Sequence, residues 1–511
     1  MKIKNILILA TLSTSLLFSC TKLEEEFDDS LSAVAEDDID PQSILQGAYS
    51  ALNNPFQDQS RFWAAQEHTG DAVIGPTRGA DWDDNGVWRV LHNHRWNADH
   101  GFLRDTYREL QQTQYFSTNV IALSAASAQQ KAEARFIRAL SMFCTLDGWD
   151  QVPFREGENF EDLTILPETK KGVDAANFII AELEAAVASL PNGPMIKANK
   201  NAAKALMMKV YLNKAVYKDR TKQPAAGDFD NADMARVIAL ADEIIASTDP
   251  KYSLQASYFE NFAPNNSAIS KEIIYALENT PGVRGGNVRS RWFAQLHYNQ
   301  NPSGWNGFAT LSDFYDKFEE DDDRLVQSYP GITSVGGVKV GFLEGQQFDQ
   351  NNVALKDRKG APLAFTREVK LTETGDNLEI TGIRVVKYPI DYVSGDQSDN
   401  EYVIFRYADV LLMKAEALLR SGNEPAARDI VNEIRNLRGV DDFTTLTLDN
   451  LIDERGRELY WEGWRRNDLI RFGKFLDAWQ EKPASDAKYL LFAIPNEQLA
   501  VNPNLTQNPG F

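Results

Sequence analysis

Residues 129–146, QQKAEARFIRALSMFCTL, and residues 199–217, NKNAAKALMMKVYLNKAVY, decide the fold class of this chain. Each segment has apolar side chains at helical spacing and alternates small residues with large ones. The small residues are Ala132, Ala134 and Ala139 in the first segment and Ala202, Ala203 and Ala205 in the second; the large ones are Phe136, Leu140, Phe143, Leu206, Val210 and Tyr211. Small residues let two helices approach closely, and large ones fill the groove opposite. The pattern therefore predicts α-helices that pack in pairs.

Six further segments extend this pattern along the chain: 102–125, 172–190, 232–247, 405–421, 425–437 and 449–479. Helix pairs of this kind stack in tetratricopeptide arrays. The repeat period of about 34 residues that such arrays show is not visible, so the repeats must be degenerate. We expect a mainly α fold in which degenerate tetratricopeptide-like helix pairs form a scaffold, rather than an α/β sheet.

Two other segments, residues 55–101 and 249–400, are rich in Gly, Asn, Asp, Pro and aromatic residues. They contain only a few short β-like runs, such as residues 382–388. Loops of this length inside a compact protein are usually functional. We therefore expect residues 41–511 to form a single domain, in which the helical scaffold carries a binding face built from long irregular loops and a few short strands.

The composition excludes several classes of protein. The 511 residues include 53 Lys and Arg against 74 Asp and Glu, a net charge of -21, which repels nucleic-acid phosphates. The two cysteines, Cys20 and Cys144, are too few for a disulfide framework or a cysteine-rich zinc module. Ten tryptophans are more informative, because an exposed Trp ring is a common means of holding a ligand.

The N-terminus has the features of a bacterial export signal. Lys2 and Lys4 precede a largely apolar run over residues 6–18, which is too short to span a bilayer. The run ends at Leu17-Phe18-Ser19-Cys20, which resembles a lipobox, where the cysteine is lipidated. We expect residues 1–19 to be a signal peptide and residues 20–40 a lipidated acidic tether that anchors the protein through Cys20.

Several further stretches resemble motifs of the SusD/RagB family. They are EARFIRA (133–139) followed by WDQVP (149–153), FRYADVLLMKAEA (405–417), ERGREL (454–459) with EGWRRNDLIR (462–471), and the close IP (494–495) with NPNLTQNPGF (502–511). These stretches occur in the family's order across almost the whole chain, and the lipobox belongs with them. Together they make a highly specific match.

This resemblance implies a SusD-like outer-membrane lipoprotein of Bacteroidetes that faces the cell exterior. Members of the family bind glycans, less often peptides, at the cell surface. They act as a lid on a SusC-like TonB-dependent transporter and deliver oligosaccharides to it. Neither catalysis nor a cofactor is implied.

The resemblance also points to candidate ligand-binding residues. A sugar ring offers an apolar face and a rim of hydroxyl groups, and an aromatic platform flanked by carboxylates, amides and an Arg is complementary to it. By position the family's binding loop corresponds to Asp71, Arg78, Trp96 and Asp99. The alternative is that Trp82 and Trp88 belong to the core and that the polar residues of this segment cap loops. Further stacking aromatics are expected in the middle stretch, where the candidates are Trp292, Tyr298 and Trp305.

Other interpretations of the same residues remain open. Asp81, Asp83 and Asn85 match the first half of a calcium-binding loop, but His92 stands where a bidentate Glu is required. The histidines at 92, 94 and 100 lack the spacing of a zinc site. Glu458 and Glu462 have the spacing of a glycosidase pair but lie among arginines, which favours an ion-pair network. The alternative function is thus a surface-anchored glycoside hydrolase; a repeat scaffold for protein partners alone leaves the Trp-rich loops unexplained.

Overall fold

The computed structural model describes residues 40–156, 162, 164–282 and 287–511 of the chain. Residues Pro41–Phe511 form one unit by their contacts. The expected signal peptide, Cys20 and all but the last residue of the expected tether lie outside the described residues. Within the described part of the chain, no helix is both long enough and apolar enough to cross a membrane.

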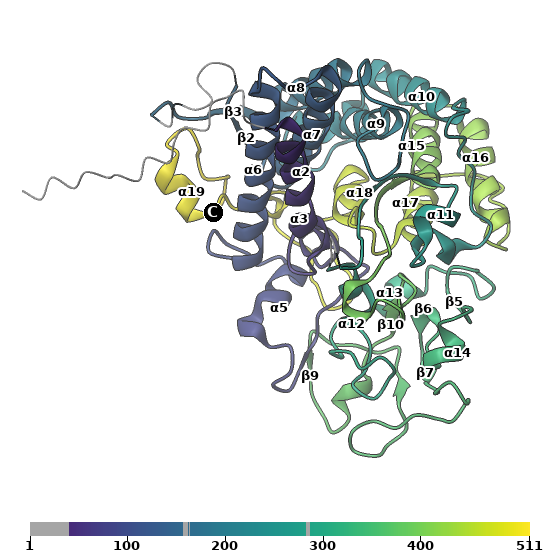
Figure 1. Cartoon of the computed structure of the whole chain (residues 1–511). Helices are drawn as coiled ribbons and strands as arrows, with labels where there is room; N and C mark the ends of the chain where they lie inside the picture. The colour runs from purple at the N-terminus through teal and green to yellow at the C-terminus, as the bar shows by residue number, and fades with distance from the viewer. Residues whose placement is uncertain (1–39, 157–161, 163, 283–286) are drawn as a thin grey trace, which may run out of the picture. The chain divides into compact units, whose positions relative to one another are not determined.

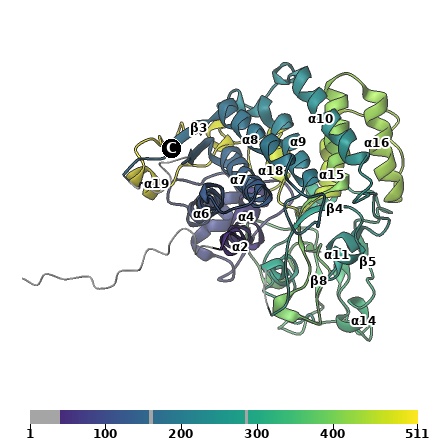
Figure 2. The ribbon, with the colours of Figure 1, turned by 45° about the horizontal axis from the view of Figure 1, so that its top comes forward.

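Long helices pack against one another in a row, which occupies the upper part of the unit in Figures 1 and 2. They are α2 (Pro41–Ala51), α6 (Gly101–Ala122), α7 (Ala128–Trp149), α8 (Gly172–Val187), α9 (Lys200–Tyr217), α10 (Asn231–Ile245), α15 (Tyr407–Arg420) and α16 (Glu424–Leu437). Contacts run from α2 to α6, through α7, α8, α9 and α10, and then to α15 and α16. The prediction of a mainly helical fold is confirmed.

Helix α7 shows how the alternation of small and large residues produces this packing. Ser127 caps its N-terminus by accepting a hydrogen bond from the Gln130 N–H, and Asp150 ends it in the left-handed region with a φ of 62°. Ala134 and Phe136 within it are fully buried. Because α7 packs against both α6 and α8, its residues from Ala132 to Trp149, small and large, are buried, except for the partly buried Arg135.

A network of buried ion pairs joins the helical row to the loop-rich segments. Its centre is Glu458, in α17 (Leu448–Leu459) just before α18 (Arg465–Arg471). Glu458 accepts hydrogen bonds from Arg324 at 3.1 Å, from Arg406 at 2.8 Å and from Arg438 at 2.9 Å. Burial alone would raise the pKa of Glu458, but the three arginines hold it well below its ordinary value.

Glu462 belongs to the same network. It accepts hydrogen bonds from Arg406 at 2.8 Å and from Lys387 at 2.6 Å, and its side chain is 4% exposed. Glu458 and Glu462 are thus buried and paired with cations, and neither lines the aromatic cavity described below. The two carboxylates therefore belong to a structural network of ion pairs, which is the interpretation that the surrounding arginines favoured.

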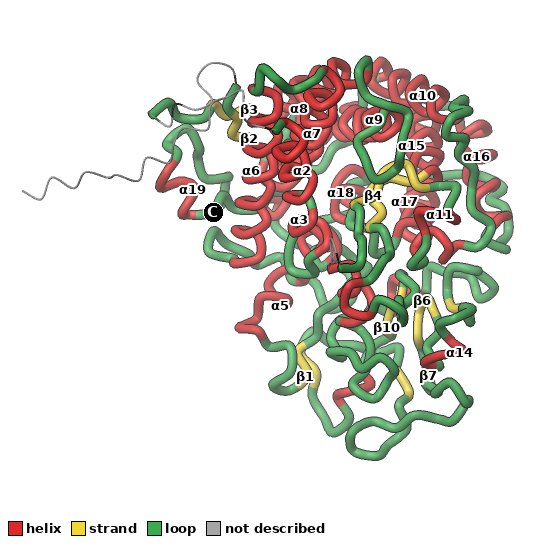
Figure 3. Tube along the Cα trace, viewed as in Figure 1, coloured by secondary structure: helices red, strands yellow, loops and turns green. Residues whose placement is uncertain are grey.

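The β-structure is limited to short strands, most of them in the loop-rich part (Figure 3). The pairs are β1 (Thr77–Arg78) with β9 (Thr372–Glu373), β2 (Gln151–Phe154) with β3 (Glu168–Lys171), β4 (Ile273–Leu277) with β11 (Tyr402–Arg406), and β7 (Gly345–Gln346) with β8 (Ala364–Phe365); β5 (Val326–Gln327), β6 (Val340–Leu343) and β10 (Arg384–Val386) make a three-stranded sheet. Only the β1–β9 pair is parallel among these. The β-like run at 382–388 contains β10.

Short helices punctuate the loops. They are α3 (Asn53–Gln57), α4 (Phe62–Glu67), α5 (Val87–His92), α11 (Asn266–Ile269), α12 (Ser290–Phe293), α13 (Ser312–Tyr315), α14 (Thr333–Gly336) and, near the C-terminus, α19 (Asn496–Val501). Ile74 and Ala309 exchange backbone hydrogen bonds of 2.9 and 3.0 Å, and Thr310 donates to Ile383 at 3.0 Å. The bridge between Ile74 and Ala309 joins residues 55–101 to residues 249–400, whereas the bridge between Thr310 and Ile383 lies within the second segment. The two loop-rich segments therefore form one face.

Candidate functional site

A cavity of about 460 Å³ lies where the two loop-rich segments meet. Its aromatic lining consists of Trp82, Trp88, Phe102, Tyr298 and Trp305, and its polar lining of Gln59, Ser60, Asp81 and Asp84. Residues 55–101 supply most of these side chains, residues 249–400 supply Tyr298 and Trp305, and Phe102 comes from the first turn of α6. An aromatic cavity with a few polar groups is the usual form of a small-molecule site.

Trp305 and Trp82 form the aromatic platform of the cavity. Trp305 is 42% exposed, which makes it one of the most exposed large aromatic side chains in the described residues. The Trp82 indole N–H donates to the Trp305 carbonyl oxygen at 2.9 Å, and the two ring centroids are 6.3 Å apart at 55°. Trp305 also packs edge-on against Phe293, at 5.0 Å between centroids. These contacts fix the orientation of both rings before a ligand binds.

The backbone at the platform is shaped to present these rings. Trp82 and Asn306 both adopt the left-handed region, with φ of 61° and 54°. Such conformations are costly for residues other than glycine and cluster at functional sites. Gly307 allows the close approach of the two loops, because a Cβ there would lie 2.2 Å from the Cζ2 atom of Trp82.

Tyr298 is held at the edge of the cavity by charged neighbours. Its hydroxyl group donates to Asp81 Oδ2 at 3.1 Å, and the Arg358 guanidinium stacks 3.9 Å from its ring centre. Arg358 in turn donates to Glu379 Oε1 at 2.6 Å. Burial, and then the negative charge of Asp81, raise the pKa of Tyr298, so its phenol stays protonated at neutral pH.

Asp81 and Asp84 are both exposed at the rim. Asp84 Oδ2 accepts a hydrogen bond of 2.8 Å from the indole N–H of Trp88. A carboxylate offers about four lone-pair sites, so each keeps acceptor capacity for ligand hydroxyl groups. Stacking faces beside carboxylate, amide and hydroxyl groups are together complementary to the apolar face and polar rim of a sugar ring.

The structure brings two of the expected site residues, Trp305 and Tyr298, into this cavity and places the others elsewhere. Trp96 is 1% exposed, and its indole N–H donates to the Leu491 carbonyl at 3.1 Å. Tyr489 and Phe492 pack against its ring. Trp96 therefore belongs to the core and not to a binding platform, because a ring that is almost fully buried cannot stack on a ligand.

Trp292 and Asp71 also lie outside the aromatic cavity: Trp292 is in the core, and the partly buried Asp71 lines a different cavity. Trp292 is 2% exposed and packs against Phe293. Asp71 accepts two hydrogen bonds from Arg465, of 2.6 and 2.8 Å. Burial alone would raise the pKa of Asp71, but Arg465 lowers it below its ordinary value. Asp71 therefore fixes α18 and does not line the aromatic cavity.

Arg78 and Asp99 take supporting positions. Arg78 is 5% exposed and donates to the carbonyl oxygens of Asn306 and Gly307 at 2.8 and 2.6 Å. It thus holds the backbone directly after Trp305 without reaching the cavity. Asp99 is exposed but accepts a hydrogen bond of 2.6 Å from the Asn496 amide, away from the cavity lining.

Sequence reasoning missed Trp82, Asp81 and Asp84 as site residues. Trp82 is half-buried and lines the cavity, whereas Trp88, at 3% exposure, is core at one edge of it. One signal could have identified Trp82: like Trp305, it lies among residues that favour turns and left-handed backbone, namely Asp81, Asp83 and Asp84. Phe102 carries no such signal, because it lies in a helix.

The possible metal ligands are used in other contacts. Asp81 and Asp83 pair with Tyr298 and Arg89, and the ring nitrogens of His92, His94 and His100 contact the carbonyl oxygens of Gln480, Thr69 and Val87. Burial lowers the pKa of His92 to about 4. Among the described residues there is no group of three or more His, Cys, Asp or Glu side chains that could hold a metal ion.

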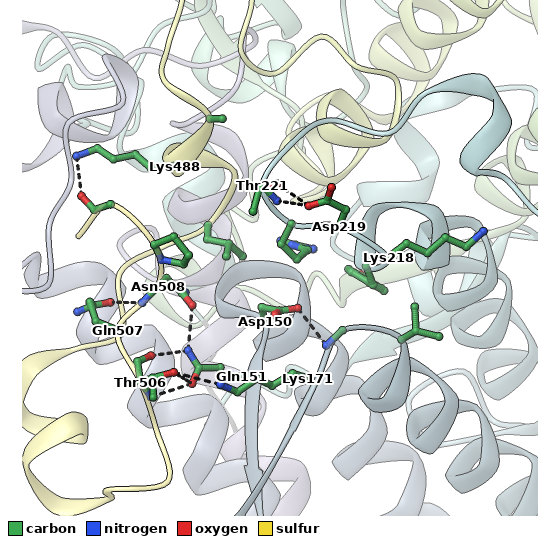
Figure 4. Close-up of a pocket in the computed structure, with 18 of the residues that line it drawn as sticks. Asp150, Gln151, Lys171, Lys218, Asp219, Thr221, Lys488, Thr506, Gln507 and Asn508 are labelled. Carbon is green, nitrogen blue, oxygen red and sulfur yellow. Dashed lines mark hydrogen bonds between the residues drawn. The ribbon is translucent and has the colours of Figure 1, made fainter.

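A larger cavity of about 840 Å³ lies beside the C-terminal segment (Figure 4). Its polar groups mostly bond to one another: Gln151 donates to the Thr506 carbonyl at 2.6 Å and to Asn508 Oδ1 at 2.9 Å, and Asp150 accepts from the Gly172 N–H at 3.1 Å. Tyr217 is the only aromatic side chain among its lining residues. These contacts secure the chain end, and the cavity offers no stacking platform.

Comparisons with known proteins agree with this fold. The model of the SusD family matches residues 246–490. The chain is 26% identical over 435 residues to the starch-binding protein SusD of Bacteroides thetaiotaomicron, covering 76% of this chain and 74% of that protein. It is 26% identical to the SusD-like protein P25 of Formosa agariphila, covering 99% of this chain and 98% of the relative.

Solved structures extend the agreement to the fold. A SusD superfamily protein from Parabacteroides distasonis superposes with a TM-score of 0.72 at 19% identity, covering 92% of this chain and 98% of that one. The overall fold is therefore shared with a known structure. Together with the match of the SusD family model to residues 246–490 and the two curated relatives, this structural likeness shows that the chain is similar to SusD-family proteins in sequence and in fold.

Proposed function

We propose that this protein is a cell-surface glycan-binding lipoprotein, which captures oligosaccharides and delivers them to a SusC-like TonB-dependent transporter. The observation that carries the proposal is the exposed platform of Trp305 and Trp82 beside two carboxylates. Sugar rings stack on such a platform, while their hydroxyl groups donate to Asp81 and Asp84. A curated relative that is 26% identical to this chain is named for starch binding, which supports glycans as the ligand class.

The proposed contacts divide between direct and supporting residues. Trp305, Trp82 and Tyr298 would contact the sugar faces, and Asp81 and Asp84 its hydroxyl groups. Arg78 would act indirectly, because its hydrogen bonds to Asn306 and Gly307 hold the Trp305 loop in place.

Direct binding measurements test this proposal. The soluble form lacking residues 1–20 is incubated with a panel of polysaccharides and oligosaccharides, and both affinity and product formation are recorded. Binding without product is expected. Release of shorter sugars would favour the alternative, a surface-anchored glycoside hydrolase, and no binding across the panel would refute glycan capture.

The anchor and the partner are part of the same proposal. Support for the anchor comes from the basic start, the apolar run over residues 6–18 and Cys20 at its end. Support for a transporter partner comes from the similarity to SusD-family proteins. With lipid on Cys20, the protein would stay at the outer membrane, facing the cell exterior, where its loop-built face meets glycans.

A further inference from the structure

The rim of the aromatic cavity is negatively charged. Asp81 has 50% of its side chain exposed, and Asp84 is also exposed. Asp81 accepts a hydrogen bond from the Tyr298 hydroxyl group and Asp84 accepts one from the Trp88 indole, and each carboxylate keeps further acceptor sites. Both carboxylates therefore face an incoming ligand as acceptors with a negative charge.

The neighbouring cations are already paired. The Arg358 guanidinium donates to Glu379 at 2.6 Å, lies 3.6 Å from Asp81 and stacks on Tyr298. Arg89 pairs with Asp83 at 2.8 Å. Arg358 thus pairs with both Glu379 and Asp81, and Arg89 pairs with Asp83. These two arginines face four carboxylates, those of Asp81, Asp83, Asp84 and Glu379, so the net charge at the rim is negative.

The residues that line the cavity agree with a negative charge. None of its nine lining residues is Lys or Arg. Each of four other cavities in the described residues includes at least one basic side chain. These side chains are Lys171, Lys218, Arg220 and Lys488 in the cavity beside the C-terminal segment, Arg155 in another, Lys317, Arg465 and Lys474 in the cavity that Asp71 lines, and Lys251 and Lys271 in a further one. The aromatic cavity differs from all four.

We infer that this cavity selects uncharged, hydroxyl-rich glycans and rejects polyanionic ones, with Asp81 and Asp84 as the residues that set this preference. The inference rests on the proposed glycan-binding function. Hydroxyl groups donate to carboxylates, and hydrogen bonds to a charged acceptor are about twice as strong as neutral ones. Sulfate and uronate groups can donate nothing there, and their charge is repelled in a partly desolvated site.

Matched ligands separate charge from shape. The probes are neutral polysaccharides (starch, laminarin, xylan, mannan) and, for each that binds, the same polymer carrying sulfate or carboxymethyl groups, measured by calorimetry. The charged derivative should bind at least about tenfold more weakly than its neutral parent. Equal or tighter binding of the derivatives, or binding confined to naturally anionic polymers such as alginate, overturns the inference while leaving glycan capture intact.

Paired variants assign the preference to the two carboxylates. In Asp81→Asn with Asp84→Asn the amide oxygens can still accept from Tyr298 and Trp88, so the cavity keeps its shape. The affinity gap, meaning the ratio of the affinities for the neutral and the charged ligand, should shrink about tenfold in this double variant. Asp429→Asn, which removes an exposed charge on α16 outside the cavity, should leave the gap unchanged. A gap that persists in the double variant overturns the assignment, and absence of binding to any polymer refutes the proposed function itself.

Discussion

At the scale of single residues, two tryptophans of the same chain have opposite roles. Trp305 is 42% exposed at the cavity, whereas Trp96 is 1% exposed beneath Tyr489 and Phe492. Both lie in aromatic, polar loop segments of the sequence. What separates them is whether another part of the chain covers the ring, and this makes them matched controls for each other.

Replacing Trp305 by Ala should weaken oligosaccharide binding by roughly 1–3 kcal/mol, since truncation of an aromatic contact of this kind removes its stacking area. The free energy of unfolding should change little, because the ring is largely exposed. Trp96→Ala should instead cost about 3–5 kcal/mol of stability, as expected for a buried Trp. Calorimetry and a thermal melt on both variants measure this; a large loss of stability in Trp305→Ala would make that ring a core residue.

Gly307 gives a second prediction at this scale. In Gly307→Ala the new Cβ would lie 2.2 Å from Trp82 Cζ2, so the Trp82 ring must move. Phe308 and Trp88, at 4.9 and 5.9 Å between centroids, restrict where it can go. We expect weaker glycan binding with a retained fold, seen as a change in tryptophan fluorescence beside an unchanged far-ultraviolet dichroism spectrum. Binding equal to that of the parent protein would show that Trp82 does not serve as a platform.

At the scale of elements, buried ion pairs connect the loops to the helices. Glu454 of α17 accepts from Arg324 at 2.6 Å, from Arg435 of α16 at 2.8 Å and from Arg457 at 2.6 Å. Burial alone would raise the pKa of Glu454, but Arg324, Arg457 and Arg435 lower it to about 2. The stability from this ionised group is present above its unfolded pKa, 4.5, and is lost as the pH falls toward about 2.

Glu454→Gln should therefore destabilise the protein at pH 7 by about 3–5 kcal/mol, because it leaves three arginines without their shared partner. The difference from the parent protein should narrow as the pH falls from about 4.5 toward 2, where the parent's Glu454 becomes protonated. Urea unfolding at pH 7 and at pH 3 measures both quantities. A difference that is the same at both pH values would contradict the assigned pKa direction.

At the scale of the whole molecule, the proposed lipid anchor and the proposed transporter partner would decide where the cavity works. Because the thiol of Cys20 would carry the diacylglyceryl group, Cys20→Ala should abolish labelling by a fatty-acid probe in cells and release the protein from the membrane fraction. Cys144→Ala is the matched control, since that thiol is buried in α7. Continued labelling of Cys20→Ala would reject the lipobox interpretation.

The partner gives a separate prediction at this scale. A lid on a transporter should co-purify with it from detergent-solubilised outer membranes, whereas a free-standing glycan binder should not. Pull-downs from cells grown on the bound glycan, at low and at moderate salt, measure this. If neither condition returns a barrel transporter, the uptake-complex proposal fails and the protein is better described as a free-standing binder; the glycan-binding variants above remain informative in both cases.

The sequence by itself determined the fold class and the loop-built face. Helical periodicity and the alternation of Ala134 with Phe136 are local properties, because each depends only on residues one or two turns apart. For the same reason the long helices lie near the segments expected to hold them. Trp305 was also accessible to local reasoning, since its neighbours Gly304, Asn306 and Gly307 favour an exposed turn.

Only the tertiary structure decided which polar and aromatic side chains belong to the cavity. Asp71 lies in the same loop segment as Asp81, but it forms an ion pair with Arg465, which is far away in the sequence. The rings of Trp82 and Trp305 meet because the backbone exchange between Ile74 and Ala309 joins two distant loops. Burial of Trp96 likewise depends on Tyr489 and Phe492. Contacts between residues hundreds of positions apart leave no periodic trace in a single sequence, and such contacts decide which rings are covered and which line the cavity.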